Sequence, residues 1–227
     1  MAEGAPTSTA RRWRMGVAAV WLATAGCAAT GPELVPRHPW IEDPTMALVD
    51  EQLKIDVASG QVQVEARFTF RWRADPGDRV LTFPVPPPCD APSGFVATLE
   101  GAGRAAVRLH ANPSDEPSSV PMGPIVERWD VHVPGDQLED HGGVLVVRYA
   151  QRCTDAFRYT LLSGAYWAGP IGELNVRILD PDQRILSATV EKQPPHRFRT
   201  STRAWSFRGL EPRGGVVLSL RPPSPDN

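Results

Sequence analysis

Apolar and polar residues alternate with a period of two along most of this chain. Over residues 62–72 every even-numbered side chain is apolar and every odd-numbered one is polar. An extended strand places these two sets on opposite faces, whereas a helix would spread the apolar residues around its circumference. The pattern therefore predicts a half-buried strand of an antiparallel sheet. Shorter runs of the same kind occur at 53–57, 145–149, 174–178, 205–207 and 216–220.

Turn-forming residues separate these runs. Gly, Pro, Asp and Ser preset φ or tolerate positive φ, and they cluster between the predicted strands. Many short strands with turns between them predict an all-β fold, an antiparallel β-sandwich of the immunoglobulin-like or jelly-roll-like kind. Two proline-rich stretches, 84–92 and 112–124, are predicted to be loops because proline lacks a backbone donor. The turn clusters lie at 59–60, 75–78, 134–136, 141–143, 180–182 and 213–215.

The N-terminal segment has the anatomy of an export signal. The arginine-rich residues 11–14 precede an apolar run, 15–25, that is shorter than the roughly 20 residues of a membrane span. The Thr-Ala-Gly-Cys sequence that ends at Cys27 resembles the lipobox of bacterial lipoproteins. The resemblance implies removal of residues 1–26 as a signal peptide and lipidation of Cys27 with palmitate. The protein would then be anchored to a bacterial membrane, on its periplasmic or cell-surface side.

Two other outcomes are open for this segment. Thr24 departs from the lipoprotein pattern, in which Leu or another aliphatic residue is usual at that position. Residues 23–25 also fit the A-x-A-like site of ordinary signal peptidase, which would release the protein. An amphipathic start that is never cleaved is the other alternative.

The remaining chain divides into a tether, a domain and a tail. Residues 27–45 hold the lipidated cysteine and a Pro- and Gly-rich tether, 46–222 the β-sandwich, and 223–227 a disordered tail. A boundary near 112–124 would instead divide two small sandwiches. Signal removal changes the formal charge from −2 to −4, with 21 Lys and Arg against 25 Asp and Glu. No large basic field is left to attract nucleic acid.

The cysteine count agrees with export and lipidation. The chain holds Cys27, Cys89 and Cys153, and lipidation of the first leaves an even pair. Disulfides persist in oxidising compartments, so a Cys89–Cys153 bond is predicted, with two free thiols as the alternative. Such a bond would attach the proline-rich stretch 84–92 to a distant strand region.

Two segments carry a resemblance to a family of uncharacterised exported bacterial β-domains. The first runs from Tyr159 through Trp167 to Gly172 in a Y-x-L-x-x-G-x-x-W-x-G-x-I-G pattern. The second is W-x-F-x-x-L-x-P at residues 205–212. The resemblance covers roughly residues 51–220. It implies an exported β-domain of unknown function and carries over no functional residues.

The search for catalytic chemistry yields no established motif. There is no G-x-S-x-G elbow, P-loop, H-E-x-x-H or C-x-x-C in the sequence. Asp130 and His132 share one strand face and would need a third ligand to hold a metal, so a solvated polar face is the simpler interpretation. Residues 139–141 and 180–182 are interpreted as turns. No catalytic residue, no metal and no cofactor is therefore predicted, and the protein is not expected to be an enzyme.

The aromatic residues raise the question of binding. Trp72, Trp205 and Phe207 lie on apolar strand faces and are predicted to be core residues. Tyr166 and Trp167 lie in a Gly-rich connection, where an exposed ring would stack on a sugar. The alternative, that Trp167 closes one end of the sandwich, is favoured.

The sequence thus favours a membrane-anchored structural or protein-interaction module whose partner is an unknown envelope protein. A ligand-binding module, for example for envelope polysaccharide, is the alternative. It would use Tyr166, Trp167 and a concave sheet face. An enzyme of unfamiliar type would need Asp130, His132 and another titratable group in one pocket.

Overall fold

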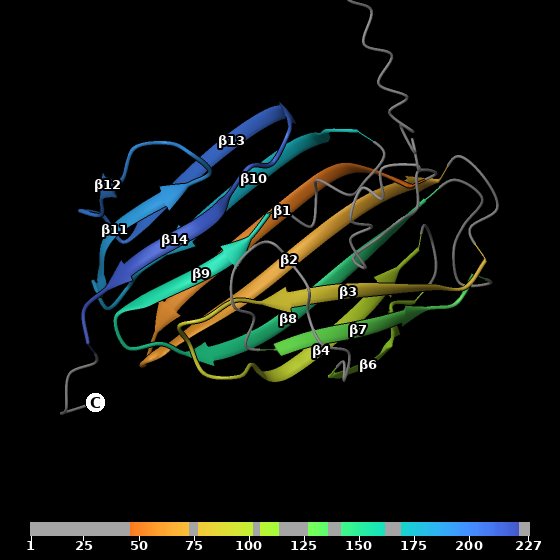
Figure 1. Ribbon diagram of the computed structural model, residues 1–227, viewed down its shortest axis with the longest axis horizontal. Coiled ribbons are helices and arrows are strands. Elements are labelled where there is room, and N and C mark those ends of the chain that lie inside the picture. Colours follow the sequence, from red (N-terminus) through yellow and green to blue (C-terminus); the bar gives the residue numbers. More distant parts are fainter. Residues whose placement is uncertain are drawn as a thin grey trace, which may run out of the picture. The chain divides into compact units, whose positions relative to one another are not determined.

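Strands form almost all of the regular structure. The computed structural model describes residues 46–72, 77–101, 105–113, 127–135, 142–161 and 169–222 (Figure 1). These residues contain fourteen strands and no α-helix, so the predicted all-β fold is confirmed. No helix in the described ranges is long and apolar enough to cross a membrane.

The largest sheet has seven strands in the order β13-β10-β1-β2-β8-β4-β5. Its central strand pair, β1 and β2, is antiparallel, and β2 coincides with the run whose alternation is clearest in the sequence. The strands of this sheet are β1 (Met46–Ala58), β2 (Gln61–Trp72), β4 (Ser93–Glu100), β5 (Val107–Arg108), β8 (Gly143–Arg152), β10 (Ile171–Leu179) and β13 (Thr202–Leu210).

Two smaller sheets form the second layer, which lies across one face of the seven-stranded sheet (Figure 1). One has the order β12-β11-β14-β9 and the other β3-β7-β6. Their strands are β3 (Arg79–Val85), β6 (His110–Pro113), β7 (Glu127–Val133), β9 (Ala156–Thr160), β11 (Ile185–Val190), β12 (His196–Arg197) and β14 (Gly215–Leu220).

The core lies between these two layers. Alternate residues of each strand point into it, as the period-two pattern requires. Phe68 of β2, Ile178 of β10 and Leu218 of β14 are fully buried there. The aromatic rings of Phe95, Trp129 and neighbouring residues stack where β4 faces β7, with 4.5 Å between those two ring centroids. Burial of such side chains contributes about 1.5–3 kcal/mol each, so this layer contact is the main source of stability.

One strand pair departs from the antiparallel arrangement. β1 and β10 are parallel, with Ile55 opposite Ile178. Parallel neighbours need a long connection between them, and here the chain forms β2 to β9 before it returns. The alternation along each strand does not reveal this, because it reports which face is buried and not which way the neighbour runs.

The proline-rich stretches are partly strand. Pro84 and Val85 end β3, and Asn112 and Pro113 end β6, although the sequence predicted loops at these positions. Both are edge strands of the three-stranded sheet, where a missing backbone donor costs no ladder hydrogen bond. The loop prediction is therefore wrong at these four residues.

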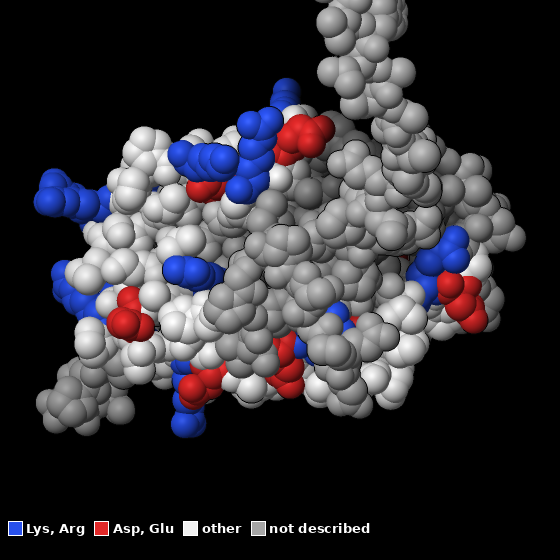
Figure 2. Space-filling model, in the orientation of Figure 1, with Lys and Arg blue, Asp and Glu red and all other residues white. Residues whose placement is uncertain are grey.

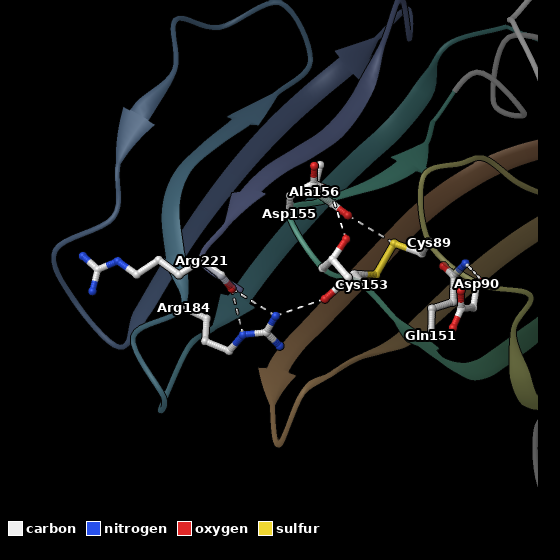
Figure 3. Close-up of a disulfide and its surroundings, with 9 residues drawn as sticks. Cys89, Asp90, Gln151, Cys153, Asp155, Ala156, Arg184 and Arg221 are labelled. Carbon is white, nitrogen blue, oxygen red and sulfur yellow. Dashed lines mark hydrogen bonds between the residues drawn. A yellow bond between two sulfur atoms is a disulfide. The ribbon is translucent and has the colours of Figure 1, made fainter. Parts of the chain in front are cut away.

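Cys89 and Cys153 form a disulfide, with 4.6 Å between their Cα atoms (Figure 3). The predicted pairing is confirmed. The bond joins the segment between β3 and β4 to the connection between β8 and β9. Around it, the Gln151 side-chain amide donates to the Asp90 carbonyl at 2.8 Å, and the Arg184 guanidinium donates to the Cys153 carbonyl at 3.0 Å.

Candidate functional site

The outer face of the seven-stranded sheet contains a hollow of about 340 Å³, which we call the sheet-face hollow. It is open to solvent, and charged or amide side chains share its walls with small and apolar residues. Lys54, Asp56, Gln63, Glu65, Ser93, Gly94, Arg148 and Ala150 line it, together with parts of Val64 and Tyr149.

Strand register explains why these side chains lie together. Lys54 of β1 is opposite Glu65 of β2, which is opposite Arg148 of β8. The next row of outward-facing residues along the strands runs from Asp56 through Gln63 to Ala150 and Ser93. Facing residues of neighbouring strands are about 5 Å apart, so each row forms a continuous line of side chains across the sheet.

A bulge in β4 creates the depth of the hollow. The pairing of β4 with β8 shifts between Ser93 and Val96. Gly94 lies in this bulge with a φ of 63° and has no atom within 4 Å of the position that a Cβ would take. Together with the small side chain of Ala150, the bulge leaves space where a regular strand with larger residues would fill the face.

Two ion pairs organise the charges on this face. The Arg148 guanidinium donates to the Glu65 carboxylate at 2.9 Å, and Arg67 contacts Glu100 at 2.6 Å. The Arg148 hydrogen bond lowers the pKa of Glu65, and Glu65 raises the pKa of Arg148 in return. Glu65 and Arg148 therefore stay charged at neutral pH, and all four side chains are partly exposed. The face thus offers fixed donors and acceptors of both signs to a polar partner.

A buried carboxyl lies on the other face of the same sheet. Glu51 of β1 points into the core and is 2% exposed. Burial raises its pKa from 4.5 to about 8, because an ionised carboxylate would lose its water there. The hydroxyl of Tyr159 on β9 donates to it at 3.2 Å and opposes part of this shift. Glu51 is therefore a neutral acid at pH 7.

The surroundings of this acid are closed. Burial also raises the pKa of Tyr149 and of Tyr159, so both phenols stay protonated. A cavity of about 10 Å³, roughly the space of one water, lies beside Tyr159 where the edges of β3 and β9 face each other. A shifted pKa is typical of functional sites, but a substrate has no room here. We therefore assign Glu51 a structural and titratable role.

Several predicted site residues lie outside the described residues: Cys27, Tyr166, Trp167 and the segment 139–141. The described ones have structural partners. The Asp180 carboxylate accepts hydrogen bonds from the backbone N–H groups of Arg184 and Ile185, both at 2.8 Å. Asp182 accepts one from Ser59, which fixes the β1–β2 turn. These contacts agree with the interpretation of 180–182 as a turn.

The predicted pair Asp130 and His132 lies on the outer face of the three-stranded sheet. Thr82 donates a hydrogen bond to Asp130 at 2.6 Å, while His132 is exposed and faces His110 of β6. Within the described ranges, no group of three or more His, Cys, Asp or Glu residues is arranged to hold a metal ion.

The predicted core aromatics lie in the interior. Trp72 and Trp205 are buried, and Phe207 is partly buried against the core. The Arg203 guanidinium lies over the Trp205 ring, 5.3 Å from the ring centroid. One face of the ring is thus covered by a cation and is not free to stack on a sugar.

Sequence reasoning missed Glu51, Tyr159 and the facing of His110 with His132. One signal for Glu51 was present, because it continues the apolar positions Leu53 and Ile55 toward the N-terminus. A charged residue at a position where the alternation predicts a buried apolar one marks an unusual site. Nothing local indicates the partner Tyr159, which is 108 residues away.

The second layer presents a different surface. Figure 2 views the molecule from that side and shows basic and acidic side chains of the described residues scattered around its outline. The exposed Val217 of β14 and Leu186 of β11 belong to the four-stranded sheet of this layer. The second layer therefore provides a reference surface for experiments on the sheet-face hollow.

No family model matches this sequence, and no curated protein matches it. Among solved structures, an M1 zinc metallopeptidase from Deinococcus radiodurans is 11% identical with a TM-score of 0.41, covering 79% of this chain and 43% of that one. A two-domain M1 zinc metallopeptidase bound to L-arginine is 10% identical with a TM-score of 0.40, and the match covers 79% of this chain and 43% of that one. Yeast LTA4 hydrolase in complex with bestatin is 12% identical with a TM-score of 0.41, and the match covers 81% of this chain and 31% of that one. The chain spans less than half the length of these proteins.

Proposed function

We propose that this protein is an exported, membrane-anchored, non-enzymatic interaction module of the bacterial cell envelope. The sheet-face hollow is its binding surface, and this observation carries the proposal. A hollow of about 340 Å³ is within the size range of ligand sites, which is about 300–1,000 Å³. Its open shape and the charged side chains in its walls suit contact with an extended partner that carries polar groups.

Two further observations support export and anchoring. The Cys89–Cys153 disulfide fits an oxidising compartment. Cys27 is the remaining cysteine, and lipidation accounts for it. An envelope protein held by a lipid meets its partner near the membrane, and a tether of about 18 residues reaches roughly 60 Å when extended.

In-cell photocrosslinking tests the binding surface. A photoreactive amino acid replaces Gln63, which is exposed in the hollow, in the full-length anchored protein. The matched control carries it at Val217, on the outer face of the four-stranded sheet. A discrete envelope adduct from Gln63 and none from Val217 supports the proposal. Adducts of equal yield from both positions, or from neither, contradict it.

Labelling with fatty acid tests the anchor. Wild-type protein should incorporate labelled palmitate, and Cys27→Ser should abolish the incorporation and leave the signal peptide uncleaved. Label that enters the Cys27→Ser variant, or never enters the wild type, excludes a lipid anchor at this residue.

A polysaccharide is the alternative partner. The amide of Gln63 and the charged pair Glu65 and Arg148 offer the hydrogen bonds that sugar hydroxyls use. The chemical nature of the Gln63 adduct separates the two candidates, because protease digestion removes a protein adduct and leaves a glycan adduct intact.

A further inference from the structure

Two histidines face each other on the three-stranded sheet, away from the sheet-face hollow. His110 of β6 and His132 of β7 are directly opposite in the strand register, and both are exposed. Their ring centroids are 5.6 Å apart. On the other side of His132, the exposed Val80 of β3 occupies the same row.

The spacing of the rings matches shared coordination of one metal ion. A Zn–N bond is about 2.0–2.1 Å, which places the ion about 3.2 Å from the centroid of each imidazole ring. Two such rings at a tetrahedral angle have centroids about 5.2 Å apart. The observed 5.6 Å is close to this value, and small χ rotations of exposed side chains bring both nitrogens to the ion.

The next row of side chains adds polar oxygens and negative charge beside the histidine pair. Asp130 precedes His132 by two residues and is opposite Asn112 of β6 on the same face. Thr82 fixes the Asp130 carboxylate with a 2.6 Å hydrogen bond. The side-chain oxygen of Asn112 is buried and has no hydrogen-bond partner. A buried unpaired oxygen is costly, and a bound cation or its water would satisfy it.

Charges of both signs lie near the histidines: Arg108 is two residues from His110, and Asp130 is two residues from His132. Arg128 lies on the same face, four residues from His132, which is about 13 Å along a strand. Asp130 lies between them, at about 7 Å from His132. The nearest formal charge along β7 is therefore negative, and it offsets the positive charge of Arg108 beside His110.

We propose that His110 and His132 bind a divalent d-block cation such as Zn²⁺, Ni²⁺ or Cu²⁺. Imidazole nitrogen suits these metals, and Asp130 supplies the compensating charge. Water completes the coordination, so the site is open to a further ligand. Each imidazole must present a nitrogen lone pair to the cation. The site is independent of the proposed function because it lies on another sheet.

Titration of the purified full-length protein with zinc sulfate, after treatment with a chelator, tests this site. We expect saturable binding of a single equivalent. His110→Ala and His132→Ala should each weaken it about tenfold or more, and the double variant should lose little beyond either single change. His196→Ala is the matched control, because His196 lies on β12 and contacts Arg203 instead.

The design also separates specific from adventitious binding. Asp130→Asn should weaken zinc binding while circular dichroism stays unchanged, since both histidines remain. Unchanged affinity in His132→Ala, equal loss in His196→Ala, or no saturable binding by the wild type would each overturn the proposal.

Discussion

Glu51 and Glu65 lie on neighbouring strands of the same sheet but on opposite faces, and their environments change their acidity in opposite directions. Glu65 pairs with Arg148 on the solvent side, and that contact lowers its pKa. Glu51 is enclosed by the second layer, and burial raises its pKa to about 8. The side of the sheet, more than the residue type, decides whether the carboxyl is charged at pH 7.

This contrast separates the structural face of the sheet from the face available for binding. Charges on the outer face keep their water and can exchange it for a partner at little cost. A charge on the inner face would lose its water and find no partner to replace it. We therefore expect changes inside to alter stability, and changes outside to alter binding with little effect on stability.

Loss of the disulfide should have the largest effect on stability. The bond closes a sequence separation of 64 residues, for which chain entropy gives a stabilisation of about 4 kcal/mol. The Cys89→Ser, Cys153→Ser double variant should thus unfold at a lower urea concentration than the wild type. Cys27→Ser is the matched control and should not shift the midpoint. Recovery of both cysteines as alkylatable thiols without reductant would contradict the bond.

The next effect is the pH dependence caused by Glu51. Below about pH 4.5 its carboxyl is protonated in both the folded and the unfolded state. Between about 4.5 and 8 only the folded state keeps the proton, so the free energy of unfolding falls as pH rises. At about 1.4 kcal/mol per pH unit, the loss by pH 7 is on the order of 3 kcal/mol.

Glu51→Gln removes this titration. Urea midpoints measured from pH 4.5 to 8 should therefore decline less in the variant than in the wild type, and the variant should be relatively more stable at pH 8. Tyr159→Phe leaves the acid in place and should keep the decline. An identical pH profile for Glu51→Gln and the wild type would show that the carboxyl ionises freely.

The smallest effect is expected on the outer face. Glu65→Gln breaks the ion pair with Arg148, but both partners are about half exposed, with side-chain accessibilities of 43% and 51%. Such pairs contribute less than about 1 kcal/mol. The pH dependence of this contribution is opposite to that of Glu51. The pKa of Glu65 is lowered, so its contribution to stability is lost as pH falls. A shift comparable to that of the disulfide variant would show that this face is structural.

The sequence predicted the faces of the strands better than their partners. Alternation over 62–72 indicated β2 and its buried side correctly, because burial repeats every second residue. The odd cysteine count indicated the disulfide. Neither the parallel β1–β10 pair nor the contact of Glu51 with Tyr159 could be predicted, because both join residues far apart in the chain.

The candidate site was harder to predict than the fold. The sheet-face hollow depends on the bulge at Gly94, and a lone glycine near the start of a strand has several possible meanings in a sequence. The histidine pair depends on β6 and β7 meeting across a proline-rich stretch that has no hairpin signal. Local sequence patterns reveal which side chains are buried, whereas the hollow and the histidine pair depend on the register between strands.

The most direct test of the account is to fill the sheet-face hollow and measure binding and stability together. Ala150→Trp places a large ring beside Gln63, on the solvent side of the sheet. The account predicts a melting temperature within about 2 °C of the wild type, because less than about 0.5 kcal/mol is at stake at such a surface site. It also predicts loss of the envelope adduct from a photoreactive residue at position 63. A stable Ala150→Trp protein that still forms this adduct in full yield would contradict the assignment of the hollow as the binding surface.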